Sequence, residues 1–317
     1  MQKLNIVFTI DKNYVQHFTV ACTSLLENNS EFIDKIYLVH SITENDILEK
    51  EKLKISLNYF KQKYNIVIEQ IFLFNNVLDK FKISHHITKA TYFRLLLPEI
   101  LPDNIDKILY LDSDIIVNGI LNDLLKLNFV IKNDVYLNCS TLSESMNTDN
   151  EYYLMAVDHQ HEISIPQLER LRMIGHSGLK YFNAGVMYIN LKKWRDDNIS
   201  NKLIENAIKH NDHIILWDQD VLNITFDMQW GELDYSYNAF NLTAEDINNE
   251  LKIIHYISSL KPWHFDNNHP YKYLYWKYLK MTPFKRYIPA DLTIIKLIKK
   301  IIPPKIKKII KFLILRK

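Results

Sequence analysis

The sequence predicts an α/β protein built on a mostly parallel sheet, and three observations support this. Strand-like and helix-like segments alternate through the first 140 residues, a rhythm typical of a parallel sheet covered by helices. The chain has 317 residues, enough for one large α/β domain or two modest ones. Its composition, 47% apolar and 24% charged, is that of a soluble globular protein.

The elements of the first half follow from the hydrophobic pattern. Short runs rich in Ile, Leu, Val and Tyr predict strands at 4–10, 35–39, 66–73 and 107–111. Amphipathic stretches between them predict helices at 14–27, 44–60 and 88–97. Because ligands bind outside the carboxyl ends of such strands, Asp11 and Asp112 should face one crevice.

The second half contains a polar insertion at 141–180, which is expected to pack helices around 152–158 and 166–173. Strand character returns at 181–191 and 252–255, and helical patterns cover 199–209 and 219–224. No domain boundary is visible before residue 281. We therefore expect residues 1–281 to form one domain and residues 282–317 a C-terminal helical tail.

Cysteine usage and the N-terminus predict a cytoplasmic protein. Cys22 and Cys139 are the only cysteines, and two such thiols do not make a disulfide framework. We expect both to act as small buried hydrophobes. No basic segment followed by an apolar one precedes the first strand, so no signal peptide is predicted.

The C-terminal segment differs in charge from the rest. Residues 292–317 hold nine basic side chains and no acid, interleaved with Ile, Leu and Phe. The remaining 291 residues carry 30 basic and 37 acidic side chains, a net charge of −7, which argues against nucleic acid as a partner. The segment is too charged to span a bilayer. It predicts an interfacial helix on an anionic inner leaflet, and a solvated helix docked on the body is the alternative.

The most informative segment is the apolar run 108–117, which contains Asp112 and Asp114 between two predicted strands. Burying an unpaired carboxylate costs several kcal/mol, so two of them need compensation. A divalent cation with a preference for oxygen ligands supplies it. Such a metal can also hold the diphosphate of a nucleotide-sugar, whereas a solvated turn or helix cap is the alternative for this pattern.

A second signal follows the strand predicted at 252–255. His255 can supply a nitrogen ligand beside two carboxylates, a mixture that suits Mn²⁺. Lys261 lies in a loop bounded by Pro262 and Trp263, where its ammonium group can neutralise a departing diphosphate. Metal on one side and ammonium on the other make a leaving-group site; a structural histidine is the alternative.

Asp11, Asn13 and Tyr14 directly follow the first strand. An aromatic ring and polar side chains are suited to holding a nucleoside, by stacking on the base and hydrogen bonding to its edge or to the ribose. Capping of the next helix is the alternative for Asp11 and Asn13.

Four other residues are candidates for contact with a sugar. Arg94 lies inside an apolar helix and must pair with a structural carboxylate or reach the crevice. Asn183 enters a strand beside Ala184 and Gly185, and a glycine there indicates a β-bulge or the close approach of a ligand or backbone. Asp218 and Gln219 open a helix, where one can face a sugar while the other caps.

In this order, these motifs resemble the family-8 retaining glycosyltransferases, which include bacterial lipopolysaccharide galactosyl- and glucosyltransferases. The resemblance covers roughly residues 4–284. It implies a GT-A (Rossmann-like) nucleotide-sugar-binding fold, Mn²⁺ with Mg²⁺ as the alternative, and UDP-galactose or UDP-glucose as donor.

The resemblance also implies a role for each candidate. The expected metal ligands are Asp112, Asp114 and His255, and uridine would be held by Asp11, Asn13 and Tyr14. The residues expected to line the hexose are Arg94, Asn183, Asp218 and Gln219. Lys261 would contact the diphosphate. Ser258 departs from the pattern, because the family usually has a glycine there whose backbone meets the diphosphate.

The implied reaction moves a hexose to a glycan with retention, giving an α-linkage. A neutral amide is a poor nucleophile, so a same-face substitution is favoured over double displacement through Gln219 or Asp218. The expected acceptor is a lipid-linked glycan such as a lipopolysaccharide or lipooligosaccharide core, at the inner face of the bacterial cell membrane. Alternatives are capsule, teichoic acid or glycoprotein glycans, or a catalytically silent binding protein. A nucleotidyltransferase is disfavoured because no glycine precedes residue 119.

Overall fold

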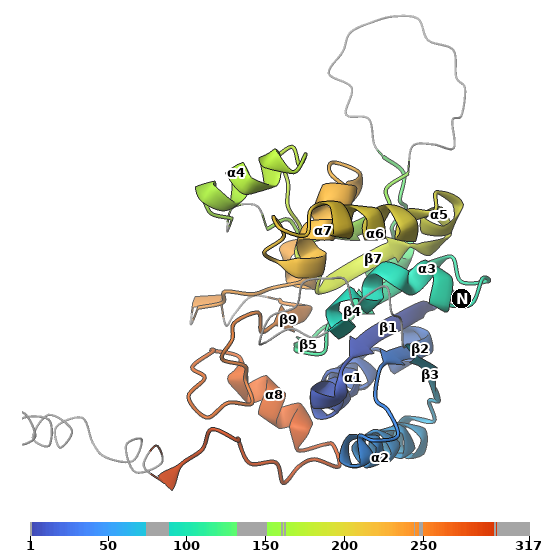
Figure 1. The fold of residues 1–317 in the computed structure, drawn as a ribbon. Coiled ribbons are helices and arrows are strands. Elements are labelled where there is room, and N and C mark those ends of the chain that lie inside the picture. The colour runs from blue at the N-terminus through green and yellow to red at the C-terminus, as the bar shows by residue number, and fades with distance from the viewer. Residues whose placement is uncertain are drawn as a thin grey trace, which may run out of the picture.

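In the computed structural model, a seven-stranded sheet is covered by helices on both faces (Figure 1). The structure describes residues 2–73, 89–131, 151–159, 161, 163–243, 245–246, 250–294 and 296. The strand order is β3-β2-β1-β4-β7-β6-β8. In this order, the strands are Ile68–Phe72, Ile33–His40, Leu4–Ile10, Lys107–Leu111, Val186–Asn190, Leu154–Ala156 and Trp230–Glu232.

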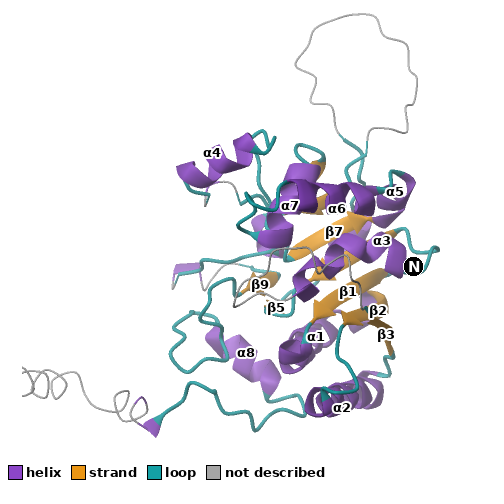
Figure 2. Cartoon of the chain, viewed as in Figure 1, coloured by secondary structure: helices purple, strands orange, loops and turns teal. Residues whose placement is uncertain are grey.

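The helices lie in two layers (Figure 2). α1 (Val15–Asn29) and α2 (Ile47–Tyr64) pack on one face of the sheet. The other face is covered by α3 (Leu97–Ile100), α5 (Leu191–Asp196), α6 (Ile199–Lys209) and α7 (Trp217–Thr225). α8 (Lys272–Leu279) lies against α1, and α4 (Ile165–Met173) precedes β7. The 3-10 helices are Lys12–Tyr14, Ser30–Phe32, Lys89–Leu96, Asn122–Lys126 and Tyr235–Tyr237.

The strand directions bring particular chain segments to one edge of the sheet. β1 is parallel to β2 and β4, whereas β7 is antiparallel to β4. The carboxyl ends of β1 and β4 therefore meet the amino end of β7. Beyond this edge, β5 (Ile115–Val117) and β9 (Ile253–His255) form a small antiparallel sheet in which Ile115 pairs with His255.

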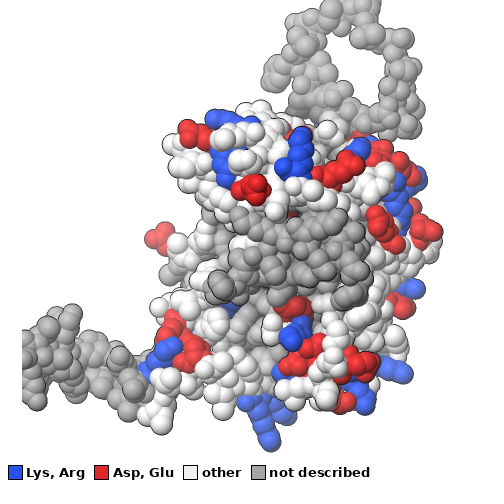
Figure 3. Space-filling model, viewed as in Figure 1, with Lys and Arg blue, Asp and Glu red and all other residues white. Residues whose placement is uncertain are grey.

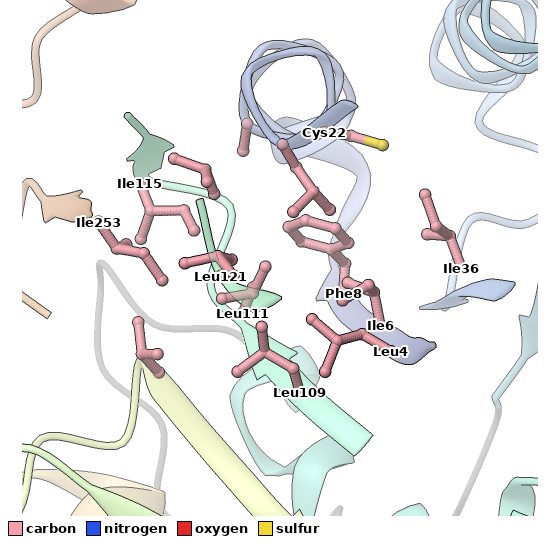
Figure 4. Close-up of a cluster of buried hydrophobic side chains, with 14 of the residues drawn as sticks. Leu4, Ile6, Phe8, Cys22, Ile36, Leu109, Leu111, Ile115, Leu121 and Ile253 are labelled. Atoms are coloured by element: carbon pink, nitrogen blue, oxygen red, sulfur yellow. The ribbon is translucent and has the colours of Figure 1, made fainter. Parts of the chain in front are cut away.

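The core explains why these segments form strands. β1 buries residues on both of its faces, so it reads as an almost continuous apolar run. Figure 4 shows one of the two faces, where the β1 side chains Leu4, Ile6 and Phe8 pack beneath α1. Cys22 of α1 is fully buried in the same cluster, as predicted. Cys139 lies outside the described residues.

Most predicted elements are confirmed, and a few differ. The strand predicted at 181–191 is shorter, Val186–Asn190, and residues 282–293 of the predicted helical tail form turns and loop. The helix predicted around 152–158 is wrong: residues Leu154–Ala156 form β6, hydrogen-bonded to β7 on one side and β8 on the other. A short run buried on both faces carries no periodicity that separates a strand from a helix. The helix predicted at 88–97 is a 3-10 helix, Lys89–Leu96, which continues into α3.

Acidic and basic side chains are interspersed over the face shown in Figure 3. Among the helices that the structure describes, none is both long and apolar enough to cross a membrane. The predicted basic tail lies outside the described residues beyond Lys296.

Candidate active site

The carboxylates of Asp112 and Asp114 and the imidazole of His255 converge at the carboxyl end of β4. Both acids lie in the turn between β4 and β5, and the pairing of β5 with β9 brings His255 beside them. His255 Nε2 lies 3.2 Å from Asp114 Oδ1 and 3.9 Å from Asp112 Oδ2. One ligand atom from each residue lies within 4.8 Å of the other two. Two carboxylates and an imidazole at this spacing fit a divalent cation such as Mn²⁺.

Gly185 provides the space that this cluster needs. A Cβ atom there would lie 2.2 Å from Cε1 of His255 and 2.9 Å from Oδ2 of Asp112. The close approach predicted for this glycine is therefore made by two side chains of the protein itself.

The two oxygens of Asp112 have different surroundings. Oδ1 accepts hydrogen bonds from Arg94 Nη2 and from the hydroxyl of Tyr110, both at 2.8 Å. Thr9 lies 2.8 Å from the same hydroxyl. Oδ2 is the oxygen that faces His255. Tyr110 is not among the predicted site residues, although residues two apart in a strand share a face, which places it beside Asp112.

Asn238 holds the other nitrogen of His255. Its Oδ1 lies 2.9 Å from His255 Nδ1, and its Nδ2 donates to Asn183 Oδ1 at 2.9 Å. Asn238 is fully buried, directly after the 3-10 turn Tyr235–Tyr237. No sequence pattern marks this position, so Asn238 is not among the predicted site residues.

Lys261 reaches the same centre from the loop after β9. Its Nζ lies 2.7 Å from Asp114 Oδ2 and 2.6 Å from the carbonyl oxygen of Tyr256. Burial would raise the pKa of Asp114, but Lys261 and His255 lower it below its ordinary value. Asp114 is therefore held as a carboxylate.

Ser258 does not contact these residues. Its side chain is exposed, and its hydroxyl donates to the carbonyl of Leu260 at 2.9 Å.

Arg94 lies between two of the predicted carboxylates. In addition to Asp112, its guanidinium approaches Asp218, whose Oδ2 lies 2.9 Å from Nε. The Nε hydrogen itself points to the carbonyl of Thr91 at 3.1 Å, so the contact with Asp218 is electrostatic. Burial raises the pKa of Asp218 to about 7; Arg94 opposes this shift, and the negative charge of Asp112 adds to it.

Gln219 is held by a set of directed hydrogen bonds. Its Oε1 accepts from Asn183 Nδ2 and from the backbone N–H of Ala184, both at 3.1 Å. Its Nε2 donates to the hydroxyl of Tyr181 at 3.3 Å. Both lone pairs of the amide oxygen are therefore engaged.

The turn that enters α7 is strained. Trp217 has a φ of 46°, a left-handed conformation that costs a bulky residue about 1–3 kcal/mol. Asp220, which is fully buried, accepts hydrogen bonds from the N–H groups of Ile215 and Leu216 and so closes this turn. Arg170 of α4 neutralises the carboxylate, with Nη1 at 3.0 Å. Neither member of this pair is among the predicted site residues.

Asp11, Asn13 and Tyr14 lie at the carboxyl end of β1. Asp11 caps the 3-10 helix Lys12–Tyr14, because its Oδ1 accepts a hydrogen bond from the Asn13 N–H at 2.7 Å. This is the capping role given above as the alternative. Tyr14 packs edge-on against Trp263, with 5.9 Å between ring centroids. Burial raises the pKa of Tyr14, and the charges of Asp114 and Asp11 add to the shift. This group is therefore near the carboxylate pair, without a hydrogen bond to it among the described contacts.

The structure thus connects eight predicted residues, six of them through direct contacts and the remaining pair, Asn183 and Gln219, through Asn238, and it places three others beside them. The connected residues are Arg94, Asp112, Asp114, Asn183, Asp218, Gln219, His255 and Lys261. Asp112 and Asp114 follow β4, and Asn183 precedes β7. Arg94 belongs to the 3-10 helix Lys89–Leu96, and Asp218 and Gln219 belong to α7. His255 ends β9, and Lys261 lies in the loop after it.

Comparison with known proteins shows the family of this chain. Residues 5–267 match the model of the family described as glycosyl transferase family 8. General stress protein A of Bacillus subtilis is 29% identical over 88% of this chain and 94% of its own length. Lipopolysaccharide 1,2-glucosyltransferase of Escherichia coli is 29% identical over 83% of this chain and 74% of its own length.

Among solved structures, the galactosyltransferase LgtC in complex with donor and acceptor sugar analogs superposes with a TM-score of 0.71. It is 22% identical, and the match covers 91% of this chain and 98% of that one. The likeness shows the shared α/β fold. With the family model spanning most of its length, this chain belongs to glycosyl transferase family 8.

Proposed function

We propose that this protein is a retaining hexosyltransferase that moves galactose or glucose from a UDP-sugar to a glycan with an α-linkage. The convergence of Asp112, Asp114 and His255 on one point beside Lys261 carries the proposal. Two carboxylates, an imidazole and an ammonium group suit the diphosphate of a nucleotide-sugar and the cation that accompanies it.

Asp112, Asp114 and His255 would hold Mn²⁺, with Mg²⁺ as the alternative. When bound, the ion supplies positive charge to the diphosphate leaving group. Lys261 supplies a second positive charge on the same side, because its Nζ already lies at Asp114. Asp11, Asn13 and Tyr14 would hold uridine at the end of β1, and the Ser258 backbone replaces the usual glycine near the diphosphate.

Arg94, Asn183, Asp218 and Gln219 would line the hexose. The state of Gln219 supports a same-face substitution, because its Oε1 already accepts two hydrogen bonds and has no free lone pair for nucleophilic attack. Burial raises the pKa of Asp218 to about 7, which disfavours its carboxylate form and weakens it as a nucleophile. Arg94 then serves to hold both carboxylates in place.

The acceptor proposal rests on the relatives. Two of them are named lipopolysaccharide 1,2-glucosyltransferase and lipopolysaccharide 1,3-galactosyltransferase, so we propose a lipid-linked glycan as acceptor. The basic and apolar segment 292–317 would bring the enzyme to the anionic inner face of the bacterial membrane. Both features support the proposal of a reaction at a lipid surface.

Calorimetric titration tests the donor site without an acceptor. The ligands are UDP, UDP-galactose, UDP-glucose and GDP-mannose, each with and without Mn²⁺, and a D114N variant is the control. We expect Mn²⁺-dependent binding of one UDP-hexose above the others and loss of the Mn²⁺ dependence in D114N. Absence of binding by every uridine nucleotide would contradict the proposal.

A further inference from the structure

A chain of side-chain hydrogen bonds runs from the metal-ligand candidate His255 to Gln219. His255 Nδ1 lies 2.9 Å from Asn238 Oδ1, and Asn238 Nδ2 donates to Asn183 Oδ1 at 2.9 Å. Asn183 Nδ2 then donates to Gln219 Oε1 at 3.1 Å. His255, Asn238 and Asn183 are 4%, 0% and 8% exposed, so water does not readily replace a missing partner.

Two backbone groups set the direction of this chain. The Gly185 N–H donates to Asn183 Oδ1 at 2.9 Å, and the Ala184 N–H donates to Gln219 Oε1 at 3.1 Å. A backbone N–H only donates, so the side-chain atom that it meets must be an oxygen. The backbone therefore fixes the orientation of the side-chain amides of Asn183 and Gln219. Flipping either amide would place its NH₂ group against a backbone N–H, so that two donors would face each other.

The orientation of the Asn183 amide also determines which nitrogen of the His255 imidazole carries a hydrogen. Because Asn183 presents an oxygen, Asn238 must turn its NH₂ group toward it and its carbonyl oxygen toward His255. That oxygen only accepts, so His255 Nδ1 must carry a hydrogen. The opposite arrangement would leave a buried polar pair unsatisfied, and water could not readily replace the lost partners.

We infer that Asn238 is a positioning residue that keeps a proton on Nδ1 of His255 and thereby presents the Nε2 lone pair to a cation between Asp112 and Asp114. The inference rests on the proposed function for the identity of the ion. The geometry agrees with it, because Nε2 is the ring nitrogen nearest both carboxylates, at 3.2 Å from Asp114 Oδ1 and 3.9 Å from Asp112 Oδ2, so a bound cation would replace the proton that Nε2 shares with Asp114. A partner on the second ring nitrogen commonly determines which nitrogen of a histidine binds a metal.

The first experiment measures Mn²⁺ affinity by calorimetry in the purified full chain. We expect N238L to bind Mn²⁺ about 10–100-fold more weakly than the wild type. N238D retains an oxygen acceptor for His255 Nδ1, so it should bind close to the wild-type affinity while losing the donor to Asn183. Unchanged affinity in N238L would overturn the inference.

Asn29 offers a matched control. It is 1% exposed, donates to the Gly119 carbonyl at 3.0 Å and accepts from the Leu121 N–H at 2.7 Å, away from the metal-ligand candidates. N29L should therefore lower the free energy of unfolding without changing the Mn²⁺ affinity. An equal loss of affinity in N29L and N238L would mean that general destabilisation, not the contact with His255, explains the effect.

The second experiment reads the proton directly, in the metal-free protein. Nitrogen-15 NMR of protein labelled at histidine, with H255Q identifying the resonances, should show a proton on Nδ1 of His255. A ring with a proton on Nε2 and none on Nδ1 would overturn the inference even if every variant folds. Failure of the wild type to bind Mn²⁺ would instead contradict the proposed metal site, and the NMR result would still decide the role of Asn238.

Discussion

Gly185 and His255 approach so closely that a Cβ atom on the glycine would lie 2.2 Å from Cε1 of the imidazole. We expect G185A to displace His255 and weaken Mn²⁺ binding by about 10–100-fold, as loss of an orienting contact does. Calorimetry measures the affinity, and circular dichroism checks the fold. G119A, whose new methyl group would meet Lys252 and not a ligand candidate, is the control. Equal Mn²⁺ affinities in G185A and the wild type would show that the imidazole has room to move.

Arg94 holds two carboxylates that would otherwise lack a cation. We expect R94M to lower the free energy of unfolding by about 3–5 kcal/mol, because it leaves Asp112 and Asp218 uncompensated. Urea denaturation in the presence of a chelator measures this loss. The double variant R94M/D218N should recover part of it, since one buried charge is removed. If the loss of unfolding free energy in R94M/D218N equals the sum of the losses in the two single variants, the two side chains are not coupled.

Asp218 should give the stability a distinctive pH dependence. Its pKa of about 7 in the folded protein exceeds the ordinary value of about 3.9 in an unfolded chain, so the folded state binds this proton more tightly. The stabilisation is full below about pH 4 and disappears as the pH rises through about 7. The wild type should therefore lose stability relative to D218N across this range. Urea titrations from pH 4.5 to 8 without metal measure the difference in unfolding free energy between the wild type and D218N. A difference that does not change with pH would contradict the raised pKa of Asp218.

Arg170 should affect turnover through the turn that carries Gln219. R170M leaves the fully buried Asp220 carboxylate without its cation, so we expect the Trp217 turn to relax and Gln219 to shift. A displacement of about 1 Å in a reacting site can reduce kcat by about 100-fold, whereas UDP affinity should stay unchanged. Arg172 on the same helix is exposed, which makes R172M the control. Equal kcat values in R170M and R172M would exclude the role.

The basic tail should be needed for membrane binding and not for chemistry. Asp291 accepts from the Phe265 N–H at 2.8 Å, and Lys296 pairs with Asp266 at 2.6 Å, so a truncation after Lys296 keeps these contacts with the loop beyond Lys261. We expect the shortened protein to lose sedimentation with anionic vesicles while keeping activity on soluble acceptors. Undiminished vesicle binding would mean that another surface contacts the membrane.

The parts of the molecule that the sequence predicts well are those with a strong local pattern. The bounds 107–111 of β4 and 199–209 of α6 agree with the structure because a buried strand and an amphipathic helix each leave a clear pattern. β6 was mistaken for a helix because its residues are buried on both faces and show no period. Asn238 could not be found, since its role depends on long-range packing that places a coil residue against His255 and Asn183.

The direction of β7 has a chemical consequence. A parallel strand following β4 would have ended at this edge of the sheet, and its last peptide groups would have offered free carbonyl oxygens. Because β7 is antiparallel to β4, the chain enters the strand here, and the N–H groups of Ala184 and Gly185 are available instead. The reversal of a single strand thus gives the crevice two backbone donors beside the Ala184 carbonyl that accepts from Arg94, and through two amides these donors determine where an imidazole in a separate sheet keeps its hydrogen.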